Sequence, residues 1–193
     1  IHFQAFQRGD ELGPLETRGK TDRTGNKTFF KPDRQIFGDL KYDAALLTTR
    51  FRELAFLNKG ITIRFIDERN DPVVEEIFHY DGGIREFVER LNKSRQSLHE
   101  GVIYVERAEA GVTVEIAAQF HDGYQENVQS FANNIRTIEG GTHVSGFKSA
   151  LTSAMSNYAR RSNMFKSGEK PASEDFREGL TAVISVKVPE PQF

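Results

Sequence analysis

The sequence contains no cysteine, and several other absences narrow what the chain can be. Without cysteine there is no disulfide framework, thiolate nucleophile or cysteine-based zinc site, so a reducing compartment, the cytoplasm, is the expected location. No apolar run approaches the roughly 20 residues of a membrane span, and the first residues lack the charged and apolar regions of a signal peptide. The formal net charge of −2 lacks the basic excess typical of a dedicated nucleic-acid-binding domain.

The composition that is present is that of a folded protein. The 193 residues are 37% hydrophobic and 28% charged, with 16 phenylalanines, which suits one large domain or two small ones. The chain begins with Ile1 instead of an initiator methionine and stops at Phe193, shortly after an apolar stretch. We therefore expect an excised segment of a longer protein.

Helical periodicity is clearest between residues 39 and 58. The apolar positions there recur at steps of three and four residues, at Leu40, Ala44, Leu47, Phe51, Leu54 and Ala55. This spacing predicts a helix that buries one face and ends before Gly60. Similar spacing predicts helices over residues 84–92 and 144–160, and a short helical turn near Ser173.

Alternating apolar residues and turn signals predict the strands. We expect strands at residues 2–8, 27–31, 61–66, 74–78, 102–107, 112–120, 124–135 and 179–188. Short turns predict hairpins from 61–66 to 74–78 and from 102–107 to 112–120. The polar residues 162–173 are typical of a loop. Many strands with three helices predict an α+β or mixed α/β fold.

No catalytic or metal-binding motif stands out. The five histidines are far apart and lack the two-histidine helical spacing that metalloproteases use. No serine lies in a Gly-x-Ser-x-Gly turn, so a hydrolase triad has no nucleophile. We predict no catalytic residue and no metal site.

Two glycine pairs and one basic stretch leave alternatives open. Gly82-Gly83 and Gly140-Gly141 precede helices, where backbone amides can hold a phosphate, but neither pair matches a P-loop, so a turn role is favoured. The most basic stretch, residues 136–170, holds Arg136, Lys148, Arg160, Arg161, Lys166 and Lys170. These side chains fit either contacts to DNA phosphates or a solvated helix face.

Five stretches carry a resemblance to a known family. They are FRELAFLNKGITIRFIDER (51–69), FHYDGGIREFVERLN (78–92), FHDGYQENVQSFANNI (120–135), EGGTHVSGFKSALT (139–152) and REGLTAVISVKVPEPQF (177–193). In this order they resemble the DNA gyrase B family, from late in its GHKL ATPase domain through most of the following transducer domain. The resemblance implies a boundary that divides residues 1–72, the end of the ATPase sheet, from residues 73–193, a transducer similar to domain 2 of ribosomal protein S5.

The same resemblance implies a function for the parent protein. The family binds and hydrolyses ATP with Mg²⁺ to dimerise its N-terminal gate and capture a DNA segment, working with the gyrase A subunit. The transducer carries the nucleotide state to the DNA-cleaving core. By the family pattern, the catalytic Glu, the Mg-binding Asn and the glycine-rich lid precede Ile1, and the Gln-Thr-Lys loop follows Phe193. The piece alone is therefore expected to need no cofactor and to be inactive.

Three positions are candidates for family contacts. Where the family commonly has Thr-Gly-Thr beside the adenine, this chain has Thr24-Gly25-Asn26, so Asn26 is the adenine-side candidate. Arg136 and Lys148 flank the Gly140-Gly141 turn and are candidates to line the DNA cavity. An ordinary surface role for these two cations stays open.

Other interpretations remain open. The ATPase subunit of topoisomerase IV shares the same stretches, and a stand-alone interaction or dimerisation module with this fold would have no link to ATP. A more distant GHKL relative, such as a MutL-like or Hsp90-like protein, would share the fold but not the five stretches.

Overall fold

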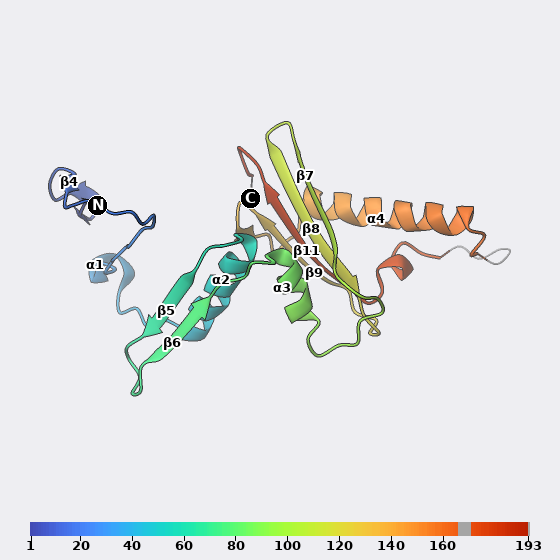
Figure 1. Cartoon of the computed structure of the whole chain (residues 1–193), viewed down its shortest axis with the longest axis horizontal. Coiled ribbons are helices and arrows are strands. Elements are labelled where there is room, and N and C mark those ends of the chain that lie inside the picture. Colours follow the sequence, from blue (N-terminus) through green and yellow to red (C-terminus); the bar gives the residue numbers. More distant parts are fainter. Residues whose placement is uncertain (166–170, 193) are drawn as a thin grey trace. The chain divides into compact units, whose positions relative to one another are not determined.

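The computed structural model describes residues 1–165 and 171–192 of the chain. The chain divides into two compact units, Ile1–Asp43 and Ala44–Phe193. Helices and strands both occur along it, in a mixed α/β fold (Figure 1). Within the described ranges, no helix is long and apolar enough to cross a bilayer.

The first unit is built from very short elements. They are β1 (His2–Phe3), β2 (Phe6–Gln7), β3 (Asp10–Glu11), β4 (Glu16–Thr17) and α1 (Arg34–Phe37). β1 pairs with β4 and β2 with β3, both antiparallel. The strand predicted at 2–8 is therefore two short pieces, and the strand predicted at 27–31 is wrong, because those residues have no strand beside them and stay irregular. None of residues 1–43 is buried.

The second unit begins with a helix and a hairpin. α2 covers Ala44–Leu57 and starts five residues later than predicted, at 44 instead of 39. β5 (Ile63–Asp67) and β6 (Val74–Phe78) pair antiparallel, which confirms the first predicted hairpin. α3 (Ile84–Leu91) and α4 (Thr142–Arg161) confirm the two other predicted helices, and a single 3-10 turn, η1 (Asp175–Arg177), lies next to the turn expected near Ser173.

A five-stranded sheet forms the centre of this unit. Its strands are β7 (Ile103–Glu109), β8 (Val112–Phe120), β9 (Asn127–Ala132), β10 (Ile135–Arg136) and β11 (Leu180–Lys187). They lie in the order β10-β9-β11-β8-β7. β11 is the middle strand, parallel to β9 and antiparallel to β8, and every one of its residues except the last is buried. A strand buried on both faces has a nearly continuous apolar sequence, as β11 does.

Two turns with positive φ shape the sheet. Ala110 and Gly111, with φ of 50° and 79°, join β7 to β8 in the predicted hairpin. Asn133 and Asn134 also have positive φ, 47° and 66°, and fold β10 back onto β9. The single strand predicted over 124–135 is therefore wrong at its end. Asparagine tolerates the left-handed conformation better than other residues with a Cβ, so an Asn-Asn pair can close a tight turn.

Helices cover both faces of the sheet. Alternate residues of β11, Leu180 and Ala182 among them, pack toward Phe147 and Leu151 of α4. Val183, on the opposite face, packs with α2 and α3. α4 is the crossover that carries the chain from β10 to β11, across one face.

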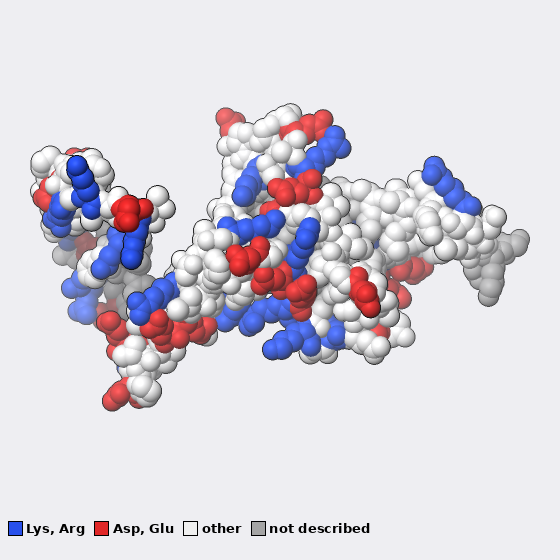
Figure 2. Space-filling model, in the orientation of Figure 1, with Lys and Arg blue, Asp and Glu red and all other residues white. Residues whose placement is uncertain are grey.

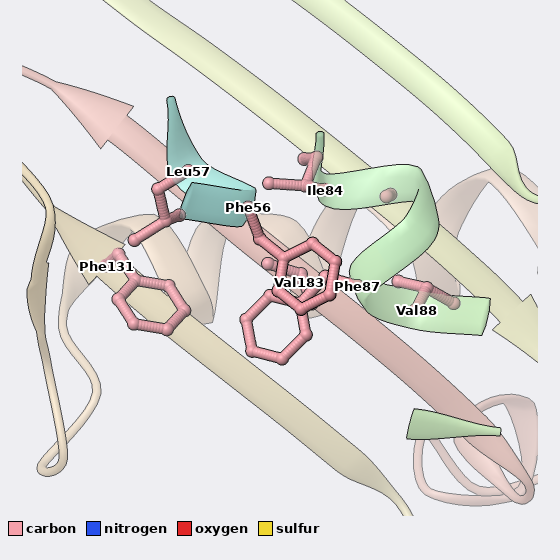
Figure 3. Packing of buried hydrophobic residues seen from close by; sticks show 8 residues of the cluster. Phe56, Leu57, Ile84, Phe87, Val88, Phe131 and Val183 are labelled. Atoms are coloured by element: carbon pink, nitrogen blue, oxygen red, sulfur yellow. The ribbon is translucent and has the colours of Figure 1, made fainter. Parts of the chain in front are cut away.

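The largest cluster of the core joins the end of α2 to the sheet (Figure 3). The ring of Phe56 stacks on that of Phe87 with centroids 4.7 Å apart, and on that of Tyr80 at 3.7 Å. Phe87 in turn contacts Phe131 of β9 at 6.2 Å. Burying one such side chain contributes about 1.5–3 kcal/mol, so the last turn of α2 is a structural part of this core.

Candidate functional site

The polar residues around the end of α2 form a second set of contacts with the sheet. Glu53 is buried, its side chain only 8% exposed, and accepts hydrogen bonds from Arg50 at 2.8 Å and from Arg136 of β10 at 3.4 Å. Asn134 of the β9–β10 turn donates to the side-chain oxygen of Asn58 at 3.1 Å. A buried carboxylate needs paired partners, so Glu53 holds α2 and the edge of the sheet in one geometry.

A tyrosine-centred cluster extends this junction. Lys59, just after α2, donates to the hydroxyl of Tyr104 at 2.8 Å, and its ammonium also lies 3.1 Å from Glu115. Burial of the hydroxyl raises the pKa of Tyr104 to about 12, and the hydrogen bond to Glu115 adds to this. The Tyr104 hydroxyl raises the pKa of Lys59. The guanidinium of Arg85 lies over the Tyr104 ring, 4.1 Å from its centroid. This cluster ties α3 and the α2–β5 loop to β7.

The glycine pair before α3 serves this packing. A Cβ on Gly83, whose φ is +60°, would lie 2.6 Å from the stem of Lys59. The carboxylate of Glu86 turns back and accepts a hydrogen bond from the Gly82 N–H. The start of α3 therefore has its own carboxylate, which favours the turn role of Gly82-Gly83 over a phosphate site.

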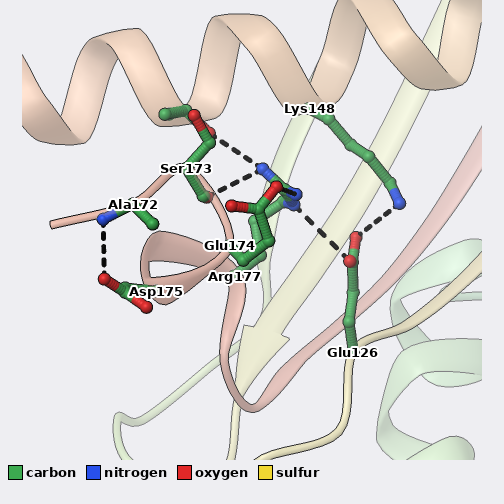
Figure 4. A network of polar contacts seen from close by, with 8 residues as sticks. Glu126, Lys148, Ala172, Ser173, Glu174, Asp175 and Arg177 are labelled. Atoms are coloured by element: carbon green, nitrogen blue, oxygen red, sulfur yellow. Dashed lines mark hydrogen bonds and ion pairs between the residues drawn. The ribbon is translucent and has the colours of Figure 1, made fainter.

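The second candidate DNA contact, Lys148, lies on α4 in a separate network (Figure 4). Its ammonium is 2.9 Å from Glu126, in the loop between β8 and β9. Glu126 also faces the guanidinium of Arg177 in η1, at 3.5 Å. In the described residues, Arg136 and Lys148 thus contact different carboxylates, Glu53 and Glu126, and belong to separate networks.

The second glycine pair lies beside a hollow. Gly140 and Gly141, with φ of 81° and 144°, lead into α4 and border a hollow of about 1030 Å³. Its lining includes valines from β8 and β11, together with Arg136 and His143. His143 is 3.1 Å from the hydroxyl of Thr137, and burial lowers its pKa. The positive φ values support a turn role for this pair as well.

The adenine-side candidate, Asn26, lies in the first unit. It is exposed, and its side-chain oxygen accepts a hydrogen bond from the hydroxyl of Thr28 at 2.7 Å. Nothing in these contacts tests its role, so that role stays a prediction.

Charge is distributed unevenly over the second unit. α4 carries three basic residues, Lys148, Arg160 and Arg161, and no Asp or Glu. On the face drawn in Figure 2, acidic and basic side chains alternate around α3, whereas most of α4 is uncharged up to the basic side chains at its end. Two members of the predicted basic stretch, Lys166 and Lys170, lie outside the described residues. A helix without acidic residues is suited to lie near an anionic polymer.

Sequence reasoning missed three residues of these networks. Glu53, Glu126 and Arg177 were not among the candidates, although each pairs with a candidate or with its partner. The described ranges contain no group of three or more His, Asp or Glu side chains that could hold a metal ion.

Comparison with known proteins gives consistent matches. A family model described as DNA gyrase B matches residues 83–193. The DNA gyrase B protein of Halalkalibacterium halodurans is 53% identical over 197 residues, covering 100% of this chain and 30% of that protein. The DNA gyrase B protein of Clostridium acetobutylicum is 52% identical over 195 residues, with the same coverage. The chain thus spans about 30% of the length of these relatives.

A solved structure agrees with this match. The 43K ATPase domain of Thermus thermophilus gyrase B, in complex with an aminocoumarin, superposes with a TM-score of 0.81 at 37% sequence identity. The superposition covers 100% of this chain and 53% of that one. The fold described above therefore occurs inside a longer ATPase domain.

Proposed function

Since this chain belongs to the DNA gyrase B family, we propose that it is the coupling piece of the ATPase subunit of a bacterial type II DNA topoisomerase. In the parent protein it links ATP binding and hydrolysis to dimerisation of the N-terminal gate and to DNA strand passage with negative supercoiling. Gyrase A and DNA are the partners, and the cytoplasm is the location. Both relatives named above are gyrase subunits, which favours gyrase over topoisomerase IV.

One observation carries the coupling role. The end of α2 is built into the same core as β9 and β11, through the stack of Phe56 on Phe87 and the contact of Phe87 with Phe131. We take residues 1–72 as the end of the ATPase domain and residues 73–193 as the transducer. On that division, α2 is the ATPase helix that enters the transducer core, so its movement displaces the sheet. A movement of packed elements is the usual carrier of ligand-driven change.

The buried Glu53 is the polar counterpart of this contact. It belongs to α2, while Arg136, its partner, belongs to β10 at the edge of the sheet. A rigid ion pair at such a junction transmits displacement, whereas a solvated one lets the two elements slide. We further propose that Arg136 and Lys148 face captured DNA and that Asn26 lies beside the adenine in the parent protein.

The first test compares this chain with the same chain extended at both ends to the full length of its relatives. We expect the extended protein to bind and hydrolyse ATP and the 193-residue chain to do neither. ATP hydrolysis by the short chain would contradict the assignment of catalysis to residues outside it. If neither protein binds ATP, the fold stands but the topoisomerase function does not.

The second test addresses coupling in the extended protein. Glu53→Gln removes the charge that joins α2 to β10, so we expect ATP-analogue binding to be retained and DNA supercoiling to fall several-fold. Glu109→Gln is the matched control, because Glu109 pairs with Arg107 on the surface of β7, where both side chains are at least 70% exposed. Equal supercoiling by the two variants would rule out a coupling role for Glu53.

A further inference from the structure

The loop residue Glu126 lies between two cations that come from different elements. Its Oε1 is 2.9 Å from Nζ of Lys148 on α4, and its Oε2 is 3.5 Å from Nε of Arg177 in η1 (Figure 4). Each carboxylate oxygen thus faces one cation. The two cations share the negative charge of Glu126, and Arg177 also faces Glu174 at 3.4 Å.

The two cations differ in how firmly they are held. The side chain of Arg177 is 11% exposed, and its other nitrogens donate to Thr152 of α4 at 3.2 Å, to the backbone oxygen of Ser173 at 2.8 Å and to Glu174 at 3.4 Å. The side chain of Lys148 is 35% exposed, and Glu126 is its carboxylate partner. Arg177 is held in place by several contacts. Within the described residues, Lys148 has fewer polar contacts and more exposure, so it is the cation to which an incoming anion can bind.

We infer that Glu126 masks the charge of Lys148 until DNA displaces it, and that Arg177 makes this exchange inexpensive. The inference rests on the proposed contact between Lys148 and DNA. When a phosphate takes Lys148, Glu126 keeps Arg177 as a partner, so no carboxylate is left unpaired. A carboxylate without a partner would oppose the exchange.

The site of the exchange is connected to the turn that precedes the middle strand of the sheet. Lys148 and Thr152 are one helical turn apart on α4, and Arg177 connects Thr152 to η1, which lies just before the buried strand β11. Release of Lys148 therefore changes the charge balance at the entry to β11. Glu126 is a positioning residue in this scheme, because DNA contacts Lys148 and not Glu126.

The test measures binding of the 193-residue chain to a short duplex DNA at low salt by fluorescence anisotropy. Glu126→Gln keeps an oxygen for Arg177 and removes the mask, so we expect binding to tighten about two- to five-fold, the value of a partly exposed ion pair. The slope of log K against log salt should stay the same, because Lys148 makes the same phosphate contact in both proteins once Glu126 is displaced.

A matched variant separates masking from general charge. Glu174→Gln also removes one negative charge and also faces Arg177, but Glu174 is 77% exposed and Lys148 is not among its ion-pair partners. We expect a smaller effect from this variant. In a Lys148→Ala background, Glu126→Gln should have no larger effect than Glu174→Gln.

The outcomes distinguish the two claims. If Lys148→Ala weakens binding but Glu126→Gln acts like Glu174→Gln, or weakens binding, the mask is wrong and the DNA contact stands. If Lys148→Ala changes nothing, or no variant binds DNA, the DNA contact itself fails and the mask with it.

A measurement on the unmodified chain avoids dependence on a folded Glu126 variant. The NMR signal of the Arg177 Nε–H should shift when duplex DNA is added, because Glu126 then faces Arg177 alone. The shift should vanish in Lys148→Ala. A shift that persists in Lys148→Ala would overturn the exchange.

Discussion

The two compact units of the chain differ most in what they bury. In Ile1–Asp43 no residue is buried, and large apolar side chains are open to solvent, with Phe29 91% and Phe30 69% exposed. In Ala44–Phe193 the rings of Phe56 and Phe131 are at most 1% exposed. Both units contain phenylalanine, so the presence of large apolar residues does not account for the difference.

The difference lies in what each strand has beside it. Strands of the first unit are two residues long and pair only as isolated ribbons, which are marginal in water. β11 of the second unit has a strand on each side and helices on both faces. A β segment becomes part of a core only when pairing and coverage come together, and that condition is met in the second unit alone.

The largest expected effect tests this contrast with one substitution made in both units. Phe56→Ala removes a ring stacked on two others and leaves a cavity, so we expect a loss of about 3–5 kcal/mol in the free energy of unfolding. Phe29→Ala should change it by less than about 0.5 kcal/mol. Urea unfolding followed by circular dichroism measures both. Similar losses would show that the first unit has a core of its own.

The next largest expected loss of stability comes from comparing two glycines that have similar φ values, one in each unit. Gly179 has φ of +69°, and a Cβ there would lie 2.3 Å from the backbone oxygen of His121. Gly38 has φ of +65° with nothing within 4 Å of the added Cβ. We expect Gly179→Ala to cost about 3 kcal/mol or more, from strain and collision together. Gly38→Ala should cost about 1–3 kcal/mol, from backbone strain alone. The melting temperatures of the two variants measure this difference. Equal values would contradict the close approach of the His121 backbone oxygen to Gly179.

The same contrast explains what the sequence could predict. Elements with a strong local signal were correct: the β7–β8 hairpin closed by Gly111, helices α3 and α4, and the apolar run of β11. The segment 27–31 failed, although it has the same local signal as a strand, because no other strand lies beside it. The sequence of a single segment does not show whether another strand will pair with it.

The residues that contact α2 from distant parts of the chain could not be predicted from the sequence, for a related reason. The helical spacing of α2 marked Phe51, Leu54 and Ala55 as apolar positions, but of these only Ala55 is buried. The other buried residues at the end of the helix are Glu53, Phe56 and Leu57. Helical periodicity predicts one buried face of a helix. The end of α2 is buried on more than one side, because it packs against the sheet. Glu53 lies 83 residues from its partner Arg136 along the chain. No spacing rule identifies such a pair.

Ion pairs in the two units allow a finer comparison. Glu53, 8% exposed, faces two arginines that are partly exposed, so Glu53→Gln should cost about 1–2 kcal/mol after allowance for solvent screening. Glu16 of the first unit pairs with Arg18, and both side chains are about half exposed. Glu16→Gln should cost less than about 0.5 kcal/mol. The free energy of unfolding of both variants is measured with and without added salt. If salt reduced the losses caused by Glu53→Gln and Glu16→Gln equally, the carboxylate of Glu53 would be as solvated as that of Glu16.

The last comparison, whose pH dependence is confined to alkaline solution, probes the junction between α2 and the sheet through Tyr104. Its pKa is raised from 10.0 to about 12, first by burial of the hydroxyl and then by Glu115. The unfolded chain ionises this tyrosine near pH 10.0 while the folded chain keeps it neutral to about pH 12, so the free energy of unfolding must fall as pH rises between these values. Below pH 10 the contribution is constant. Tyr104→Phe should remove that part of the fall, measured as the difference in urea midpoint between the variant and the unmodified chain across this range. An unchanged difference would mean that the hydroxyl is solvated, and that the Lys59–Tyr104 contact does not hold the end of α2 against β7.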